Sequence, residues 1–142
     1  MTRRWRRIVI TRPRWRWTVP VSHEIDVTKG VVFTTWSGDV TLEEARSHLR
    51  QLRDDPDFLP SMGQLSDARD VTSTVSAEGI RELASNTPFG EGSRRAIVVT
   101  SDVVFGVSRM YELRQLEGGA DVKLFRDIQE ARAWLGLERA EG

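Results

Sequence analysis

Hydrophobic residues recur along this chain with two different periods, and their alternation predicts an α/β fold. Ala96-Ile97-Val98-Val99 is a continuous apolar run rich in β-branched residues, which is typical of a central strand in a parallel sheet. Thr100-Ser101-Asp102 follows, and each of these residues can cap a helix. Val103, Val107 and Met110 then share one helical stripe. A buried strand that leads through a short turn into a helix is half of a βαβ unit.

The N-terminal half of the pattern predicts a hairpin followed by a helix. Residues 22–26 and 31–37 alternate as extended segments around a turn in which Gly30 supplies a positive φ. Thr41 and Glu44 form a capping box, and the helix that follows ends before Pro56. His48 lies beside the apolar stripe of this helix. Since no metal-ligand spacing accompanies it, we expect an ordinary helix residue there.

The remaining pattern completes the order ββαβαβαβα. Residues 63–67 predict a strand, and we expect the chain after Asp67 to leave the sheet and wind into a helix that begins near Ser76. Residues 122–125 predict the last strand, and a capping box at Asp127 starts a helix that buries Ile128, Ala131, Trp134 and Leu135. We therefore predict a single α/β domain with an antiparallel opening hairpin and parallel βα units.

Composition limits the classes of function. The 142 residues suit one domain, and without cysteine there are neither disulfides nor thiolate metal sites, which suits a cytoplasmic protein. No apolar run approaches the roughly 20 residues that span a bilayer. The net charge of zero conceals a split, because residues 1–20 carry seven arginines and no acid, which leaves the rest at −7. An acidic body disfavours nucleic acid as a partner of the folded domain.

Residues 1–20 alternate arginine with tryptophan, and several interpretations of this segment stay open. The arginines could bind phosphates while the indoles stack on bases, or the segment could lie at a membrane surface. Pro13 and Pro20 interrupt regular structure, which favours a disordered tail. The tail could also result from a start site assigned too far upstream. We expect such a tail over 1–20, a domain over 21–137 and a short tail over 138–142.

A set of segments spread over residues 22–137 carries a resemblance. They are EID, KGVVFTTWSGDVTLEE, Pro56-Asp57-Phe58, residues 65–71 (LSDARDV), the AIVV strand, residues 105–111 (FGVSRMY) and the ending Phe125-Arg126-Asp127 with Ala131, Trp134 and Leu135. Together they resemble the bacterial SpoIIAA-like, or STAS/CRAL-TRIO-like, family of small α/β domains. The resemblance implies a mixed sheet with its helices packed mainly on one face.

The resemblance also draws attention to Ser76. Anti-sigma-factor antagonists of this superfamily are switched by phosphorylation of a serine at the start of the helix after the third strand, and Ser76 occupies that position. A phosphate there would meet the positive end of the helix dipole. However, Val75 stands where the phosphorylated members carry an acidic residue. We therefore expect Ser76 to be a plain N-cap.

The carboxyl ends of the strands are the expected place for chemistry. Asp67, Asp70, Thr74 and Ser76 gather there as a candidate switch or interaction surface. Asp67 and Asp70 could alternatively hold a divalent ion or act as an acid–base pair. No assured third ligand, histidine or phosphate-binding glycine loop accompanies them. We expect no catalytic residue, no metal and no cofactor.

Large side chains suggest a second kind of site. Trp36, Phe89, Phe105, Met110, Tyr111 and Trp134 are more than a small core requires. CRAL-TRIO proteins bind lipids in a cleft, so the resemblance implies an apolar ligand or lipid as an alternative. Phe105, Met110 and Tyr111 form the candidate ligand surface, and the same surface could join two copies in a homodimer.

The leading hypothesis is a non-enzymatic STAS-like regulatory or protein-interaction module of the bacterial cytoplasm. It would present residues 67–80 to an unidentified protein partner. The alternative is a small apolar-ligand or lipid-binding domain that contacts membranes through residues 1–20. An enclosed cavity beneath the helix at 105–111 would favour the ligand, whereas a solid core would favour the protein partner.

Overall fold

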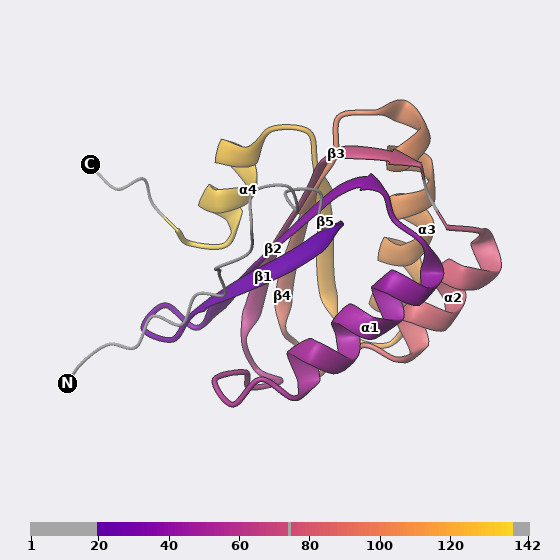
Figure 1. The fold of residues 1–142 in the computed structure, drawn as a ribbon. Coiled ribbons are helices and arrows are strands. Elements are labelled where there is room, and N and C mark those ends of the chain that lie inside the picture. The colour runs from indigo at the N-terminus through magenta and orange to yellow at the C-terminus, as the bar shows by residue number, and fades with distance from the viewer. Residues whose placement is uncertain (1–19, 74, 138–142) are drawn as a thin grey trace, which may run out of the picture.

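The computed structural model describes residues 20–73 and 75–137, so the two predicted tails lie almost wholly outside the described residues. The described chain follows the predicted order ββαβαβαβα (Figure 1). Its elements are β1 (Val21–Asp26), β2 (Val31–Asp39), α1 (Leu42–Arg53), β3 (Gly63–Ser73), α2 (Ala77–Ser85), β4 (Arg94–Val98), α3 (Asp102–Glu117), β5 (Asp121–Phe125) and α4 (Ile128–Trp134).

The strands form one mixed sheet whose spatial order equals their order in the chain. β1 and β2 are antiparallel, and the turn between them contains Gly30 with a φ of 68°. The pairs β2/β3, β3/β4 and β4/β5 are all parallel. Ala96 and Val98 of β4 are fully buried. The predicted mixed sheet with a buried β4 is therefore confirmed.

The helices cover the two faces of the sheet unequally. Parallel strands are joined by right-handed crossovers, so a sheet that grows steadily in one direction places all its crossover helices on the same face. The crossover helices α1, α2 and α3 lie together on one side, and α4 lies on the other (Figure 1). This confirms the expectation that the helices pack mainly on one face.

The caps predicted from the sequence start the helices. The Thr41 hydroxyl accepts a hydrogen bond from the Glu44 backbone N–H at 3.1 Å, and the Glu44 carboxylate accepts one from the Thr41 N–H at 2.9 Å. Ser101 caps α3. Asp127 caps α4 by accepting from the Gln129 N–H at 2.7 Å. These bonds satisfy N–H groups that a helix leaves without internal partners.

β3 is longer than predicted. The strand continues to Ser73, so the expectation that the chain leaves the sheet after Asp67 was wrong. The pairing of β3 with β4 does end at Asp67, but β2 runs on to Asp39 and pairs with the extension through two register shifts. The β-branched Val71 and Thr72 suit this extended conformation.

The buried face of α3 also differs from the prediction. Val103 is 71% exposed and Met110 is exposed as well, whereas Val104, Glu112 and Gln115 are buried. Apolar side chains occur all around this helix. Its spacing therefore could not show which side packs against the sheet.

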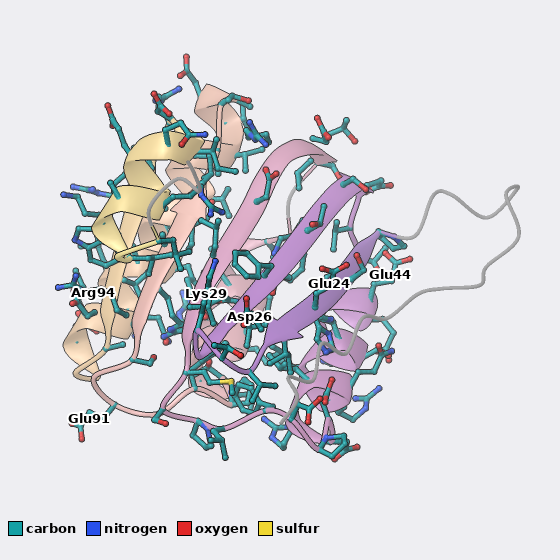
Figure 2. All side chains as sticks on the ribbon, turned by 90° about the vertical axis from the view of Figure 1, so that its left-hand side faces the viewer. Glu24, Asp26, Lys29, Glu44, Glu91 and Arg94 are labelled. Carbon is teal, nitrogen blue, oxygen red and sulfur yellow. The ribbon has the colours of Figure 1, made fainter. Side chains whose placement is uncertain are left out.

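The face covered by α4 carries a compact apolar core. It contains Leu65, Ala96, Val98, Phe125 and Ala131, flanked by Phe33, Ile128, Trp134 and Leu135. Arg94 lies on this side (Figure 2), stacks on the Trp134 ring at 4.6 Å and pairs with Asp121 at 3.3 Å. Because consecutive strand residues point to opposite faces, Arg95 faces the three crossover helices.

Two glycines test the packing of this fold. A Cβ on Gly63 would lie 2.9 Å from the Arg94 carbonyl oxygen, while a Cβ on Gly106, which is exposed on α3, would meet open space. We expect Gly63→Ala to lower the free energy of unfolding by roughly 1–3 kcal/mol. Gly106→Ala should raise it by up to about 1 kcal/mol, because alanine is the better helix former. Urea unfolding measures both changes, and a destabilising effect of the same size in both variants would contradict the described packing.

Candidate functional site

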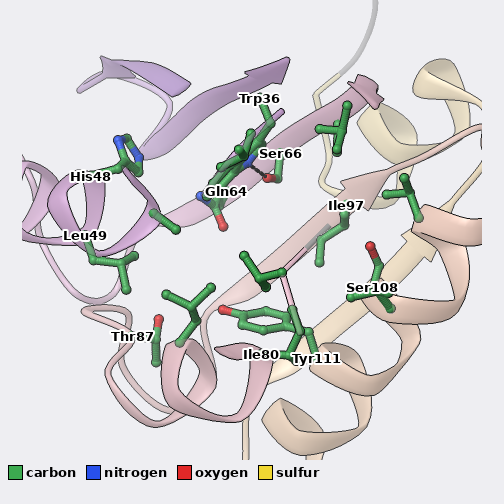
Figure 3. A pocket seen from close by; sticks show the side chains of 18 of the residues that line it. Trp36, His48, Leu49, Gln64, Ser66, Ile80, Thr87, Ile97, Ser108 and Tyr111 are labelled. Atoms are coloured by element: carbon green, nitrogen blue, oxygen red, sulfur yellow. Dashed lines mark hydrogen bonds between the residues drawn. The ribbon is translucent and has the colours of Figure 1, made fainter. Parts of the chain in front are cut away.

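A cavity of about 160 Å³ lies between part of the sheet and the three crossover helices (Figure 3). It lies beneath α3, where an enclosed cavity would favour a ligand, but it is partly open to solvent. Most of the side chains that line it are apolar: Val40, Ala45, Leu49, Leu52, Ala68, Val71, Val75, Ile80, Leu83, Phe89, Ile97, Val104 and Val107.

The sheet forms a polar floor beneath this cavity. Gln64 and Ser66 of β3 point toward the crossover helices, while Leu65 between them packs on the α4 side. The Gln64 amide donates to the Thr34 hydroxyl at 2.9 Å, and the Trp36 indole N–H donates to the Ser66 hydroxyl at 2.7 Å. A sheet face covered by helices is normally apolar. Polar side chains here therefore mark a place that differs from an ordinary core.

His48 of α1 lies at the margin of the cavity, and its ring nitrogens are buried away from the open space. It is 2% exposed, and neither ring nitrogen has a hydrogen-bond partner among the described residues. Its ring makes edge contacts with His23 at 5.1 Å and Trp36 at 5.8 Å between centroids. Burial, helped by the nearby His23, lowers the pKa of His48 to about 3. The ring is therefore neutral near pH 7, with one donor and one acceptor left free.

Arg95 of β4 lines the same cavity and is 2% exposed. Its guanidinium donates to the Thr87 hydroxyl at 3.3 Å, the Tyr111 hydroxyl at 3.1 Å and the Gln115 side-chain oxygen. Gln115 in turn donates to the Ala84 carbonyl at 2.8 Å. This chain of hydrogen bonds connects β4 with α2 and α3 at one end of the cavity.

The helix α3 forms one wall of the cavity. Val107, Ser108 and Tyr111 line it, and Figure 3 shows the Tyr111 ring projecting from α3 into the space. The titratable lining residues are His48, Arg95 and Tyr111, with no carboxylate among them. Because both His48 nitrogens lack partners, His48 does not activate a serine hydroxyl in this arrangement.

The predicted aspartates lie away from this cavity. Arg69 donates to both carboxylate oxygens of Asp67, at 2.9 and 2.8 Å, and these bonds lower the pKa of Asp67. A general acid at neutral pH needs the opposite shift. Asp70 is exposed on the extension of β3. The residues that the structure describes contain no group of three or more histidine, aspartate or glutamate side chains that could hold a metal.

The two other residues of the predicted switch surface flank this segment. Thr74 lies outside the described residues. Ser76 is the N-cap of α2, and its hydroxyl accepts a hydrogen bond from the Gly79 N–H at 3.1 Å. The predicted capping role of Ser76 is therefore observed, and its role as a switch stays a prediction.

The predicted ligand or dimer surface is divided in the structure. Tyr111 lines the cavity and contacts Arg95. Phe105 is half-buried beside Val104, under the Arg126 guanidinium at 4.4 Å. Met110 is exposed on the outer side of α3. Tyr111 thus belongs to the candidate ligand site, and Met110 remains a predicted contact for a second copy.

Sequence reasoning missed the polar part of the site. Gln64, Ser66 and Arg95 were not singled out, and His48 was taken for an ordinary helix residue. A signal was present, because Gln64 and Ser66 alternate with Leu65 in a predicted strand. Alternation of this kind shows that a strand has a polar face but not whether helices cover it.

Comparisons with known proteins place the fold. No protein-family model and no curated protein matches this sequence. The solved structures include an uncharacterised protein of the DUF3478 family, with a SpoIIAA-like fold, from Shewanella loihica PV-4. The match covers 81% of this chain and 93% of that chain, with 18% identity and a TM-score of 0.57. At this identity the likeness shows the fold alone. The chain thus has the SpoIIAA-like fold that the resemblance implied.

Within residues 20–73 and 75–137, no helix has both the length and the apolar character needed to cross a membrane.

The buried His48 predicts a pH dependence of stability. Its pKa is about 3 in the folded protein against 6.5 ordinarily, so acid protonates the unfolded chain first. Stability is therefore complete above pH 6.5 and falls as the pH decreases toward 3. His48→Leu removes this loss. When the pH is lowered from above 6.5 to 5, the free energy of unfolding of the variant should therefore rise by about 2 kcal/mol relative to that of the wild type. Urea unfolding at both pH values measures the change. All other titrating groups are shared, so parallel pH profiles would contradict a buried neutral His48.

Proposed function

We propose that this protein is a non-enzymatic binding module that takes a small ligand with an apolar body into the cavity between the sheet and α1, α2 and α3. The observation that carries the proposal is the cavity itself, about 160 Å³ and lined mostly by apolar side chains. A space of this kind in a small domain costs stability, since every lining atom loses packing contacts. A bound ligand would restore those contacts.

The volume supports a ligand of limited size. An apolar cavity of about 150 Å³ admits a benzene-sized molecule, and sites for drug-sized ligands usually start near 300 Å³. The cavity of about 160 Å³ therefore suits a single ring or a short alkyl chain. It favours such a molecule over a larger lipid, which the alternative hypothesis from the sequence also allowed.

The polar atoms in the cavity support a ligand that also carries a polar group. Both His48 nitrogens and the Arg95 Nε are buried without partners among the described residues. Each unsatisfied buried polar group costs about 1–3 kcal/mol. These atoms have almost no accessible surface, so a ligand oxygen would bond them, and recover part of that free energy, only after neighbouring side chains shift.

A second candidate function is the presentation of the segment from β3 to α2 to a protein partner. The supporting observation is that β3 pairs with β4 only as far as Asp67, while its extension to Ser73 pairs with β2. The edge of this extension that faces away from β2 is not paired with β4. The Arg69 N–H and C=O in this extension are already bonded to the Asp67 carboxylate and the Thr100 hydroxyl, so a peptide added as a strand would pair beyond Arg69. Asp70 and Ser76 lie at this edge and at the start of the helix that follows it.

Filling the cavity tests the binding function. Val107 and Val103 both lie on α3, but Val107 lines the cavity and Val103 is exposed. We expect Val107→Phe to abolish the thermal stabilisation that small apolar ligands give the wild-type protein, because the new ring occupies their space. Val103→Phe is the same chemical change on the solvent side and should leave that stabilisation intact.

The measurement is a thermal-shift titration with benzene, toluene, hexanol and related small molecules. A bound ligand raises the melting temperature by mass action. Native mass spectrometry of the purified protein adds a search for a co-purified molecule. If no small apolar molecule shifts the melting temperature of the wild type, or if Val107→Phe binds as well as Val103→Phe, the cavity is not a ligand site.

The partner candidate has its own test at Ser76. Ser76→Glu places a charge at the N-terminus of α2, and Ser101→Glu places the same charge at the N-terminus of α3 as a matched control. In a pull-down with wild-type protein as reference, a partner of the β3–α2 segment should be lost from Ser76→Glu and kept by Ser101→Glu. Retention by both folded variants would remove this segment as the contact surface.

A further inference from the structure

We infer that the ligand of the cavity is an anion, a small carboxylate with an apolar body, and that its carboxylate pairs with Arg95. This inference rests on the proposed binding function and adds the chemical class of the ligand. The volume of the cavity alone does not require an anion, because a neutral apolar molecule would fill the same space without contacting Arg95.

The first support is the electrostatic isolation of Arg95. The side chain is 2% exposed, yet no carboxylate of the described residues lies within ion-pair distance of its guanidinium. Arginine stays charged at any pH a folded protein tolerates. A buried charge without a counterion costs several kcal/mol, so buried arginines are normally paired. Here the counterion is missing from the described chain.

The second support is the number of unused donors. A guanidinium has five N–H groups, and the acceptors Thr87, Tyr111 and Gln115 each take one. The Nε of Arg95 is buried without any acceptor. The free donors are this Nε–H and one Nη–H, a pair that a carboxylate can bond with its two oxygens once the side chains that cover Nε shift.

The third support is that the guanidinium is held in place before any ligand arrives. Gln115 and Tyr111 reach it from α3, Thr87 reaches it from the loop after α2, and the Phe89 ring lies 5.0 Å from it. These neutral groups orient the fork and leave its charge uncancelled. Orientation in advance reduces the entropy that binding would otherwise cost.

The neighbouring Arg94 shows the contrast. It is exposed on the other face of the sheet, where Asp121 supplies a carboxylate at 3.3 Å. Its positive charge is therefore already paired and hydrated. Arg94 offers a matched control for any substitution of Arg95.

Arg95 also borders a second hollow near the ends of α2 and α3. The charges in that hollow suit an anion less well than the first cavity does. The second hollow includes Glu91 and Glu117 alongside Arg114. Two carboxylates would repel an anionic ligand. In the first cavity Arg95 is the charged residue, and the apolar walls weaken screening by water.

The experiment compares acids with their uncharged amides on the full-length protein near neutral pH. Isothermal titration calorimetry is run with hexanoate and hexanamide, octanoate and octanamide, and phenylacetate and phenylacetamide. We expect an acid to bind at least about tenfold tighter than its amide, because only the carboxylate offers the guanidinium an opposite charge and two equivalent acceptor oxygens. Arg95→Met should bring the acid down to the affinity of the amide, while Arg94→Met should leave the preference unchanged.

The outcomes separate the inference from the function on which it rests. Equal binding of acid and amide to the wild type would overturn the anionic ligand and leave cavity binding in place. Absence of binding by all six compounds would overturn both. If circular dichroism shows that Arg95→Met does not fold, Arg95→Lys replaces it. Lysine keeps the charge but lacks the planar fork, so the preference should shrink without vanishing. An undiminished preference in the substituted protein would show that the anion binds elsewhere.

Discussion

The handedness of the crossovers is the constraint on which the rest of this structure depends. Because β2, β3, β4 and β5 follow one another in a single direction, right-handed connections place α1, α2 and α3 on the same face of the sheet. One helix, α4, then covers the opposite face with a compact apolar core. The cavity lies on the face that these three helices share.

The polar floor explains why the three helices leave a cavity on this face. Apolar helices close tightly on an apolar sheet, as α4 does over Leu65 and Ala96. On the crowded face the sheet presents Thr34, Gln64, Ser66 and Arg95, whose polar atoms must find hydrogen bonds. Thr34, Trp36, Tyr111 and Gln115 supply those bonds, which hold side chains along the sheet and across to α3 instead of packing them into the centre. The cavity is the space between these networks and the apolar faces of the helices.

Buried groups without partners set this site apart from an ordinary core. His48 and Arg95 lie on different elements, α1 and β4, yet both line the same cavity and both carry polar atoms that no described residue satisfies. Stability alone would favour apolar residues at such positions. A neutral imidazole and an isolated guanidinium at these positions lower stability, and the anionic ligand that we propose would offset part of that loss. The SpoIIAA-like fold by itself specifies none of this, because one fold hosts many unrelated sites.

The sequence by itself determined the order of the elements, because hydrophobic periods and caps are local. The run Ala96–Val99, the capping box at Thr41 and the turn at Gly30 each act within a few residues, and each prediction from them is confirmed. Only the tertiary structure decided where β3 ends, which side of α3 is buried and where the site lies. β3 extends to Ser73 because β2 offers it a partner, and α3 buries Val104 and Gln115 while Val103 stays exposed because the sheet lies on that side. Contacts between distant segments set these features, so Gln64, His48 and Arg95 become one site only when β3, α1 and β4 are brought together.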